Sequence, residues 1–260
     1  MNRIQTALQQ QRTTGIPLII PYITPEFPVQ GATVPVMQSL AAAGAGMIEI
    51  GIPFSDPLAD GPVIQHSSEI AIRNGATLRC VLDLVAEARR TLTLPILLMG
   101  YANPILKYGI PRFCADAAAA AADGLIIPDL PPEESAELRS ECANHGLSTV
   151  FLMAPTSTDE RIRFIDECSS DFSYCVSVTG VTGARTSFGT DFDTFLGRVK
   201  KNAKKPFVVG FGIKSAEQVK QIAPYACGAV VGSALLQAIA ECATPTEAAA
   251  TAGTFLTGLR

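Results

Sequence analysis

The sequence predicts an α/β fold, a single (β/α)8 TIM barrel with extra helices, in which residues 1–260 form one domain. The chain has 260 residues, and barrels of this class typically contain about 250. Eight short apolar segments recur along it, each followed by turn residues and then a helix-like segment. This alternation favours parallel strands with right-handed crossovers, and eight repeats favour a closed barrel over an open sheet.

The eight apolar segments are the predicted strands. Most are rich in Val, Ile or Leu and alternate little, which is typical of strands buried on both faces. In chain order they are Pro17–Tyr22, Met47–Ile52, Pro95–Gly100, Gly124–Ile127, Ser148–Met153, Ser173–Val178, Pro206–Phe211 and Gly228–Val231.

Four of the intervening segments carry clear helix signals. One is followed by Gly146, a typical residue at a helix C-terminus. Two others begin at capping residues, Thr158 or Asp159 and Ser215. The fourth is almost entirely alanine, the best helix former, so we expect a packed helix rather than a linker. The four predicted helices are Ala115–Ala122, Glu133–His145, Asp159–Cys168 and Ser215–Ile222.

The composition excludes several classes of protein. Hydrophobic residues make up 48% of the chain and charged residues 17%, which argues against bulk disorder. The net charge of −4 argues against a nucleic-acid partner. We interpret the basic cluster Lys200, Lys201, Lys204 and Lys205 as a solvated helix end. No apolar segment reaches about 18 residues and the N-terminus lacks a signal core, so we expect no membrane span.

The cysteines and histidines predict no metal site. Seven cysteines are scattered without CxxC or Cys/His ligand spacing, so we expect free thiols and a reducing compartment, either the cytoplasm or a plastid-like equivalent. His66 and His145 lack metal-like partners nearby, and we assign both to structural roles.

Glu49 and Asp60 are the candidate catalytic residues. Glu49 lies inside an apolar strand, where a carboxyl group is costly to bury unless it is paired or has a chemical role. Burial would raise its pKa, which suits a group that both donates and accepts protons. The alternative is a strand-end residue satisfied by backbone N–H groups. Asp60 follows in a loop that could fold over the same barrel end; alternatively it is only a turn residue before Gly61.

Glycine-rich turns after the seventh and eighth strands predict a phosphate site. The first turn contains Phe211 and Gly212, and the second contains Gly232 and Ser233. Glycine lets backbone N–H groups approach an anion closely, and these two loops form the recurrent phosphate site of such barrels. The alternative is that both are simply tight turns.

The segment from Thr179 to Gly189 is long and rich in Gly, Thr and Ser. Catalytic lids often have this composition, although a loop without function is the alternative. We expect Tyr174, on the preceding strand, to point into the barrel beneath it.

The segment Ile48–Gly61, IEIGIPFSDPLADG, resembles the signature of the tryptophan synthase alpha subunit family. The resemblance extends along essentially the full chain and includes Tyr101–Pro104, Asp129–Pro131, Gly180–Gly183 and the two phosphate turns. It implies a carbon–carbon lyase of tryptophan biosynthesis. The implied reaction is the reversible retro-aldol cleavage of indole-3-glycerol phosphate to indole and D-glyceraldehyde 3-phosphate.

The resemblance also implies residue roles. Glu49 would protonate indole C3 and remove the proton of the glycerol hydroxyl, and Asp60 would stabilise positive charge at the indole nitrogen. Thr182 would close onto Asp60 and exclude water, while Tyr174 would help hold the site. The implied phosphate ligands are Gly183, Gly212, Gly232 and Ser233, and the implied indole slot is lined by Tyr22, Met99, Tyr101, Ile126, Leu152 and Phe211. Position 22 departs from the family, which often has Phe there.

A partner is implied as well: a beta subunit that carries pyridoxal phosphate, in an alpha2beta2 heterotetramer. This chain itself would hold no cofactor. The implied docking surface covers the Pro53–Leu58 loop and the Asn103–Tyr108 segment, with Pro53, Asp56, Leu58, Asn103 and Pro104 as its residues.

Three alternatives remain open at this stage. Another phosphate-binding barrel, such as a ketose-forming isomerase or an enzyme that forms indole-3-glycerol phosphate, would need a Lys or a Cys/Asp pair at strand ends, and strands three to six end without such a Lys. A non-catalytic regulatory subunit would not need both Glu49 and Asp60. A stand-alone indole-releasing lyase is poorly separated from a subunit by sequence.

Overall fold

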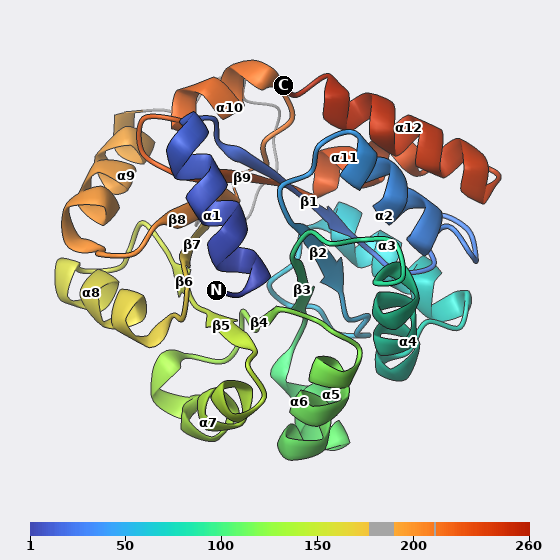
Figure 1. Ribbon diagram of the computed structural model, residues 1–260, viewed down its shortest axis with the longest axis horizontal. Coiled ribbons are helices and arrows are strands. Elements are labelled where there is room, and N and C mark those ends of the chain that lie inside the picture. Colours follow the sequence, from blue (N-terminus) through green and yellow to red (C-terminus); the bar gives the residue numbers. More distant parts are fainter. Residues whose placement is uncertain (177–189, 211) are drawn as a thin grey trace.

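The computed structural model describes residues 1–176, 190–210 and 212–260, and its architecture is the predicted barrel. A parallel sheet curls around a central axis, and most of the helices form a ring outside it (Figure 1). The strands are β1 Leu18–Ile23, β2 Ile48–Gly51, β3 Ile96–Met99, β4 Gly124–Ile126, β5 Ser148–Val150, β6 Leu152–Met153, β7 Ser173–Val176, β8 Phe207–Gly210 and β9 Gly228–Val231.

Most of the helices connect successive strands and cover the outer face of the sheet (Figure 1). The helices are α1 Arg3–Thr14, α2 Thr33–Ala42, α3 Pro62–Arg73, α4 Leu78–Ala88, α5 Ala102–Tyr108, α6 Ile110–Ala119, the 3-10 helix Pro132–Glu134, α7 Ala136–Asn144, α8 Asp159–Cys168, α9 Thr190–Asn202, α10 Ala216–Ile222, α11 Ser233–Ile239 and α12 Pro245–Thr257.

The fifth predicted strand, Ser148–Met153, is interrupted at Phe151. Its first half, β5, pairs with β4, and its second half, β6, pairs with β7. The Phe151 N–H donates to the Ser169 hydroxyl at 3.2 Å, while its carbonyl accepts from the Tyr174 N–H. The Ser169 side chain therefore takes the place of a neighbouring strand as the acceptor for the Phe151 N–H. Among the described strands, β5 and β6 are joined by the chain itself, and this connection closes the barrel.

The capping predictions for two helices are confirmed. The Thr158 side chain accepts from the Arg161 N–H at the start of α8, and Ser215 accepts from Gln218 at the start of α10. These side chains satisfy amides that have no intrahelical partner. The Glu133–His145 prediction was wrong at its start, because Pro132–Glu134 form a separate 3-10 turn before α7.

The alanine-rich helix ends earlier than predicted. We expected Ala115–Ala122, whereas α6 starts at Ile110 and ends at Ala119. Ala121 has a positive φ of 60°, a left-handed conformation that terminates a helix. Its carbonyl accepts from the Arg89 side chain at 2.8 Å, so a tertiary contact takes over where alanine propensity alone would continue the helix.

Helix α1 lies across the end of the barrel where the strands begin (Figure 1). Arg3 pairs with Asp123 just before β4, and Asn2 and Gln5 hydrogen-bond to Asp171 just before β7. These contacts fix α1 over the N-terminal ends of the strands. The opposite end of the barrel, where the strands finish, is the end that holds the candidate site.

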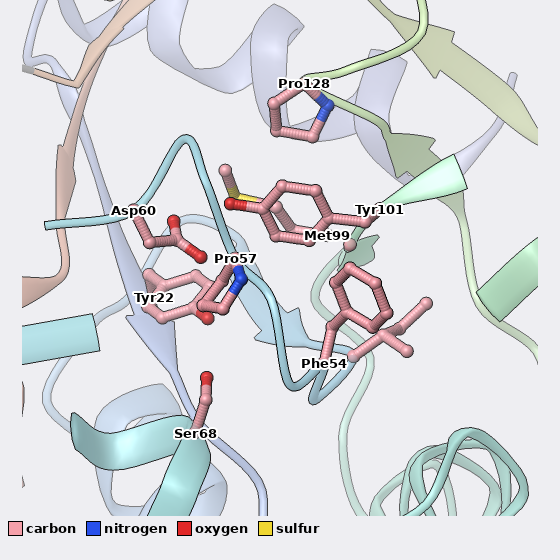
Figure 2. Close-up of a pocket in the computed structure, with 10 residues that line it drawn as sticks. Tyr22, Phe54, Pro57, Asp60, Ser68, Met99, Tyr101 and Pro128 are labelled. Carbon is pink, nitrogen blue, oxygen red and sulfur yellow. The ribbon is translucent and has the colours of Figure 1, made fainter. Parts of the chain in front are cut away.

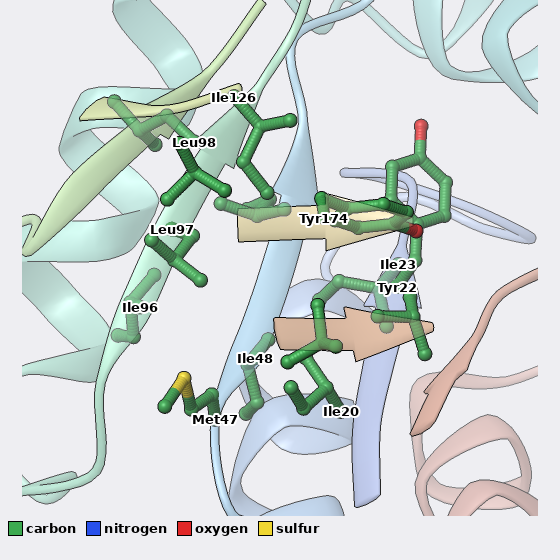
Figure 3. Packing of buried hydrophobic residues seen from close by; sticks show 14 of the residues in the cluster. Ile20, Tyr22, Ile23, Met47, Ile48, Ile96, Leu97, Leu98, Ile126 and Tyr174 are labelled. Carbon is green, nitrogen blue, oxygen red and sulfur yellow. The ribbon is translucent and has the colours of Figure 1, made fainter. Parts of the chain in front are cut away.

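The barrel interior is filled by side chains that are in register between strands. Tyr22 is the Cα partner of Glu49, which is the partner of Leu97, and such partners project from the same face of a sheet. Side chains from β1, β2, β3, β4 and β7 meet in this core (Figure 3). The interior is therefore packed, and the place left for a ligand is the layer of side chains at the C-terminal ends of the strands.

The structure also bears on the expected free thiols and on the expected absence of a membrane span. All seven cysteines are free thiols, and five of them are buried. In the described part of the chain, no helix has the length and apolar character needed to cross a membrane. The expected lid, Thr179–Gly189, lies outside the described residues.

Candidate active site

Glu49 is buried in the middle of the barrel and has no hydrogen-bond partner. The side chain has no exposed surface, and neither Oε1 nor Oε2 meets a donor. The alternative in which backbone N–H groups satisfy this carboxyl group is therefore wrong. Because burial disfavours the charged form, the pKa of Glu49 rises to about 8, and the group is mostly protonated at neutral pH.

Asp60 lies in the loop that follows β2 and titrates in a different range. Burial raises its pKa to about 6, and a hydrogen bond from the Tyr101 hydroxyl opposes part of that rise. At neutral pH Asp60 is therefore mostly ionised while Glu49 is mostly protonated. Two carboxyl groups whose environments separate their pKa values can act as an acid and as an electrostatic stabiliser.

A small cavity opens beside Asp60 at the C-terminal end of the strands (Figure 2). The volume left between its side chains is about 10 Å³, which is room for about one water molecule. In this conformation side chains fill the slot, so a ring-sized ligand requires them to move. The residues around the cavity are Tyr22, Ile52, Phe54, Pro57, Asp60, Ser68, Met99, Gly100, Tyr101 and Pro128.

Four residues expected from the sequence thus meet at one cavity: Tyr22, Asp60, Met99 and Tyr101. Tyr22 is buried, and burial together with the nearby Asp60 carboxylate raises the pKa of its hydroxyl. Thr24 hydrogen-bonds to that hydroxyl and lies 2.7 Å from Ser67, Oγ1 to Oγ. The extra oxygen of Tyr22, relative to Phe, is therefore held in a chain of hydroxyl groups.

Two further predicted slot residues, Ile126 and Leu152, lie on the inner face of the barrel but not on this cavity. Ile126 is the register partner of Met99, and Leu152 is the register partner of Tyr174. Tyr174 is buried and points into the interior with Ile126 and Tyr22 (Figure 3). Its pKa is raised by burial and then by the Glu49 carboxyl group. These side chains form the wall below and beside the cavity.

The two predicted phosphate turns occupy the ends of β8 and β9. Gly212 has a φ of +64°, a conformation that L side chains rarely adopt. Gly232 directly precedes α11, and Ser233 is the first residue of that helix. Gly232 packs close to Tyr22, since a Cβ there would lie 3.3 Å from the Tyr22 Cβ. The second turn therefore borders the predicted slot.

The two segments expected to meet a partner are neighbours in space. The Phe54 and Tyr101 ring centroids are 5.5 Å apart, and the Ala59 N–H donates to the Tyr101 hydroxyl at 3.0 Å. Leu58 is 94% exposed at the tip of this loop. Asp56 and Asn103 are also exposed, whereas Pro53 and Pro104 are half-buried.

Three predicted residues, Thr182, Gly183 and Phe211, lie outside the described residues. Among the residues that are described, no group of three or more His, Cys, Asp or Glu side chains is placed to hold a metal ion.

Sequence reasoning missed several residues that line the cavity. Ile52, Phe54 and Pro57 belong to the same loop as Asp60, and their proximity to it was the available signal. Ser68 and Pro128 come from α3 and from the end of β4. Nothing local in their sequence marks either one, because only the packing of the barrel brings them to this end.

Comparison with known proteins identifies the family. The family model "Tryptophan synthase alpha chain" matches residues 8–257. The tryptophan synthase alpha chain of Chlorobium chlorochromatii is 50% identical, over 100% of this chain and 99% of that protein. Tryptophan synthase subunit alpha from Legionella pneumophila has the same fold, with a TM-score of 0.90, 37% identity and coverage of 100% and 97%.

A tryptophan synthase complex from Pyrococcus furiosus also contains a similar chain, with a TM-score of 0.86, 37% identity and coverage of 93% of this chain and 97% of that one. The agreement in sequence and in fold extends over practically the whole length of this chain. The chain therefore belongs to the tryptophan synthase alpha chain family.

Proposed function

We propose that Glu49 and Asp60 carry out the reaction of this family in this chain. The enzyme is a carbon–carbon lyase that cleaves indole-3-glycerol phosphate to indole and D-glyceraldehyde 3-phosphate in tryptophan biosynthesis. The observation that carries the assignment is the Glu49 carboxyl group, which is fully buried without a partner and has a pKa of about 8.

Cleavage requires the indole ring to accept the electrons of the breaking bond at C3. Protonated Glu49 delivers its proton to C3, which places positive charge on the indole nitrogen. The resulting Glu49 carboxylate then removes the proton from the glycerol hydroxyl next to the breaking bond. That hydroxyl becomes the aldehyde of the product, the bonding electrons return to the ring, and Glu49 is protonated again. One carboxyl group with a raised pKa therefore serves both steps.

Asp60 has a complementary role in this proposal. At neutral pH it is mostly ionised, so it stabilises the positive charge that develops at the indole nitrogen. An electrostatic partner held in a dry site is worth more than one in water. Tyr22, Met99 and Tyr101 form the slot for the ring, with Ile126, Leu152, Tyr174 and Phe211 around it.

Phosphate binding is assigned to the turns after β8 and β9. The proposed ligands are backbone N–H groups of Gly183, Gly212 and Gly232, together with Ser233. The positive φ of Gly212 and the place of Gly232 directly before α11 support this assignment, because such amides point outward toward an anion. Thr182 completes the site by closing onto Asp60.

The partner in this proposal is a tryptophan synthase beta subunit in an alpha2beta2 assembly. Pyridoxal phosphate belongs to that subunit, and this chain holds no cofactor. The contact between Phe54 and Tyr101 supports a continuous docking surface formed by the Pro53–Leu58 loop and the start of α5. We also propose that residues 1–260 form one domain and that the protein acts in the cytoplasm.

The test is indole release from indole-3-glycerol phosphate by the purified chain, with and without its cognate beta subunit. We expect weak activity alone and strong activation by the beta subunit. Glu49→Gln should lower kcat by about 10³-fold in both settings, since general acid–base groups contribute 10²–10⁴-fold. Glu241→Gln, which changes an exposed glutamate, is the matched control.

The other outcomes separate the alternatives. High activity without the beta subunit would identify a stand-alone lyase. Binding of glyceraldehyde 3-phosphate without indole release in either setting would identify a regulatory subunit. Full activity in Glu49→Gln would show that another group moves the proton.

A further inference from the structure

Tyr101 connects the loop that carries Asp60 to the start of α5 through one polar contact and one ring contact. Its side chain is buried and follows β3 by two residues. The ring packs against Phe54 with a centroid distance of 5.5 Å. Its oxygen accepts from the Ala59 N–H at 3.0 Å. Both contacts are to the loop that carries Asp60.

The hydroxyl of Tyr101 has one proton, and its surroundings determine where that proton points. Because the oxygen already accepts from Ala59, the proton is free for a second group. Asp60 lines the same small cavity as Tyr101, and its carboxylate is the acceptor toward which that proton turns. The phenol therefore connects two consecutive residues of the loop, one through the backbone and one through the side chain.

The backbone that carries Tyr101 is fixed in turn. The next residue, Ala102, is the first residue of α5, and its N–H donates to the Asp129 side chain at 2.9 Å. Amides in the first turn of a helix have no partner within the helix, so Asp129 satisfies one of them. Asp129 follows β4, and it thereby ties the start of α5 to the neighbouring strand.

We propose that Tyr101 is a positioning residue for Asp60, whose carboxylate it holds in place from the Asp129-anchored start of α5. This inference deepens the function proposed above and rests on it only for the role of Asp60. The Tyr101 hydroxyl acts on the carboxylate, while the chemistry at indole remains with Glu49 and Asp60.

The pKa of Asp60 can report on the positioning role of Tyr101, because the neighbouring ionisable groups do not titrate in the same pH range. Tyr22 faces it from β1, Tyr101 from the end of β3 and Tyr174 from β7. Burial raises the pKa of all three phenols, so they stay neutral where Asp60 titrates. Glu49 on β2 is the other buried carboxyl group, and its pKa of about 8 keeps it protonated there.

The test compares Tyr101→Phe with wild type. Phe keeps the ring against Phe54 but removes the donor to Asp60, so the pKa of Asp60 should rise from about 6 by about one pH unit, as expected for a lost bond to a charged group. Carbon-13 NMR titration of labelled aspartate carboxyl carbons measures the pKa of Asp60 directly. The Asp60 signal is identified as the one that disappears in Asp60→Asn. The acid limb of kcat/KM for indole-3-glycerol phosphate should move upward by the same amount.

Two further variants make the result specific. Ser148→Ala removes a hydroxyl that donates to Asp171 at the opposite end of the barrel, and it should leave the Asp60 titration unchanged. Asp129→Ala should raise the Asp60 pKa in the same direction as Tyr101→Phe but by less, because the phenol remains while its backbone anchor is lost.

The inference is overturned if Tyr101→Phe leaves the Asp60 titration in place, or if activity falls equally at every pH. The NMR titration needs no turnover. If the wild type fails to cleave indole-3-glycerol phosphate, the proposed function fails, while the link between Tyr101 and Asp60 is still decided.

Discussion

Glu49 and Tyr22 are Cα partners in the register between β2 and β1, so both side chains project from the inner face of the barrel. Tyr22 reaches the cavity beside Asp60, whereas Glu49 lies fully buried and lines no part of it. Burial raises the pKa of both groups. The proposed proton donor is therefore separated from water by the same side chains that form the ring slot.

The buried carboxyl group of Glu49 should make stability depend on pH. The folded-state pKa is raised from 4.5 to about 8, so its stabilising contribution is fully present below 4.5 and is lost as pH rises to 8. Relative to Glu49→Gln, the free energy of unfolding of the wild type should fall by roughly 2 to 5 kcal/mol across that range. Urea unfolding at a series of pH values measures the difference.

The comparison isolates Glu49 because Asp60 is present in both proteins. Asp60 acts in the same direction between 3.8 and about 6, and subtraction cancels its contribution. A difference between the two proteins that stays constant from pH 5 to pH 9 would contradict the raised pKa.

Gly51 should be required because Tyr22 has a hydroxyl group. A Cβ at position 51 would lie 2.3 Å from the Tyr22 hydroxyl oxygen and 3.0 Å from the ring carbon that carries it. Gly51→Ala should therefore destabilise the fold by about 1 to 3 kcal/mol, as overpacking does, and reduce indole release. Tyr22→Phe removes the closest atom, so adding it to Gly51→Ala should restore part of both losses.

A double-mutant cycle in urea measures this coupling. Tyr22→Phe alone is the reference, since it also loses the bond to Thr24. Additive effects of the two substitutions would mean that Ala at position 51 displaces the backbone rather than the phenol.

Much of the fold could be predicted because it depends on local patterns. All eight apolar segments correspond to strands in the barrel, and the caps at Thr158 and Ser215 lie where their helices begin. The errors arose where tertiary contacts override such patterns. Ser169 takes the Phe151 amide and splits a strand, and Arg89 takes the Ala121 carbonyl where the alanine segment leaves its helix.

The residues of the candidate site likewise fall into those that local sequence could predict and those that only tertiary packing reveals. Glu49 was visible because a carboxyl group in an apolar strand is unusual wherever it occurs, and Asp60 because it follows in a loop that could fold over the same barrel end. Ser68 and Pro128 were not visible, because they reach the cavity only through the packing of α3 and the end of β4. Nor could the sequence indicate that Tyr101 joins the Asp60 loop to α5, since its two polar contacts are made across the barrel end.

Asp123 should be important for stability and unimportant for substrate binding. It is buried beneath α1, where it pairs with Arg89 and Arg3 and accepts from the Ile96 N–H at 2.8 Å. Asp123→Asn would leave the Arg89 guanidinium buried without its counter-charge, and removing one partner of a buried pair costs about 3 kcal/mol. Urea unfolding should show this loss, and KM for indole-3-glycerol phosphate should stay unchanged.

The matched control for Asp123 is Glu160→Gln, which breaks the exposed pair between Glu160 and Arg163. Exposed pairs contribute at most about 1 kcal/mol, so its unfolding free energy should stay close to that of the wild type. Equal losses in the two variants would contradict a special role for burial at the base of the barrel.

The two carboxyl groups should together confine catalysis to a narrow pH window. Asp60 must be ionised and Glu49 protonated in the free enzyme, so kcat/KM should rise through pH 6 and fall through pH 8. The maximum is then expected near pH 7, midway between the two values. Asp60→Asn should lose the acid limb and most of the rate, because Asn carries no charge to stabilise the indole nitrogen. Its alkaline limb should remain near pH 8, since Glu49 is untouched. An alkaline limb that disappeared with Asp60, or a profile that was flat from pH 6 to pH 9 in the wild type, would show that the proton at C3 comes from a group other than Glu49.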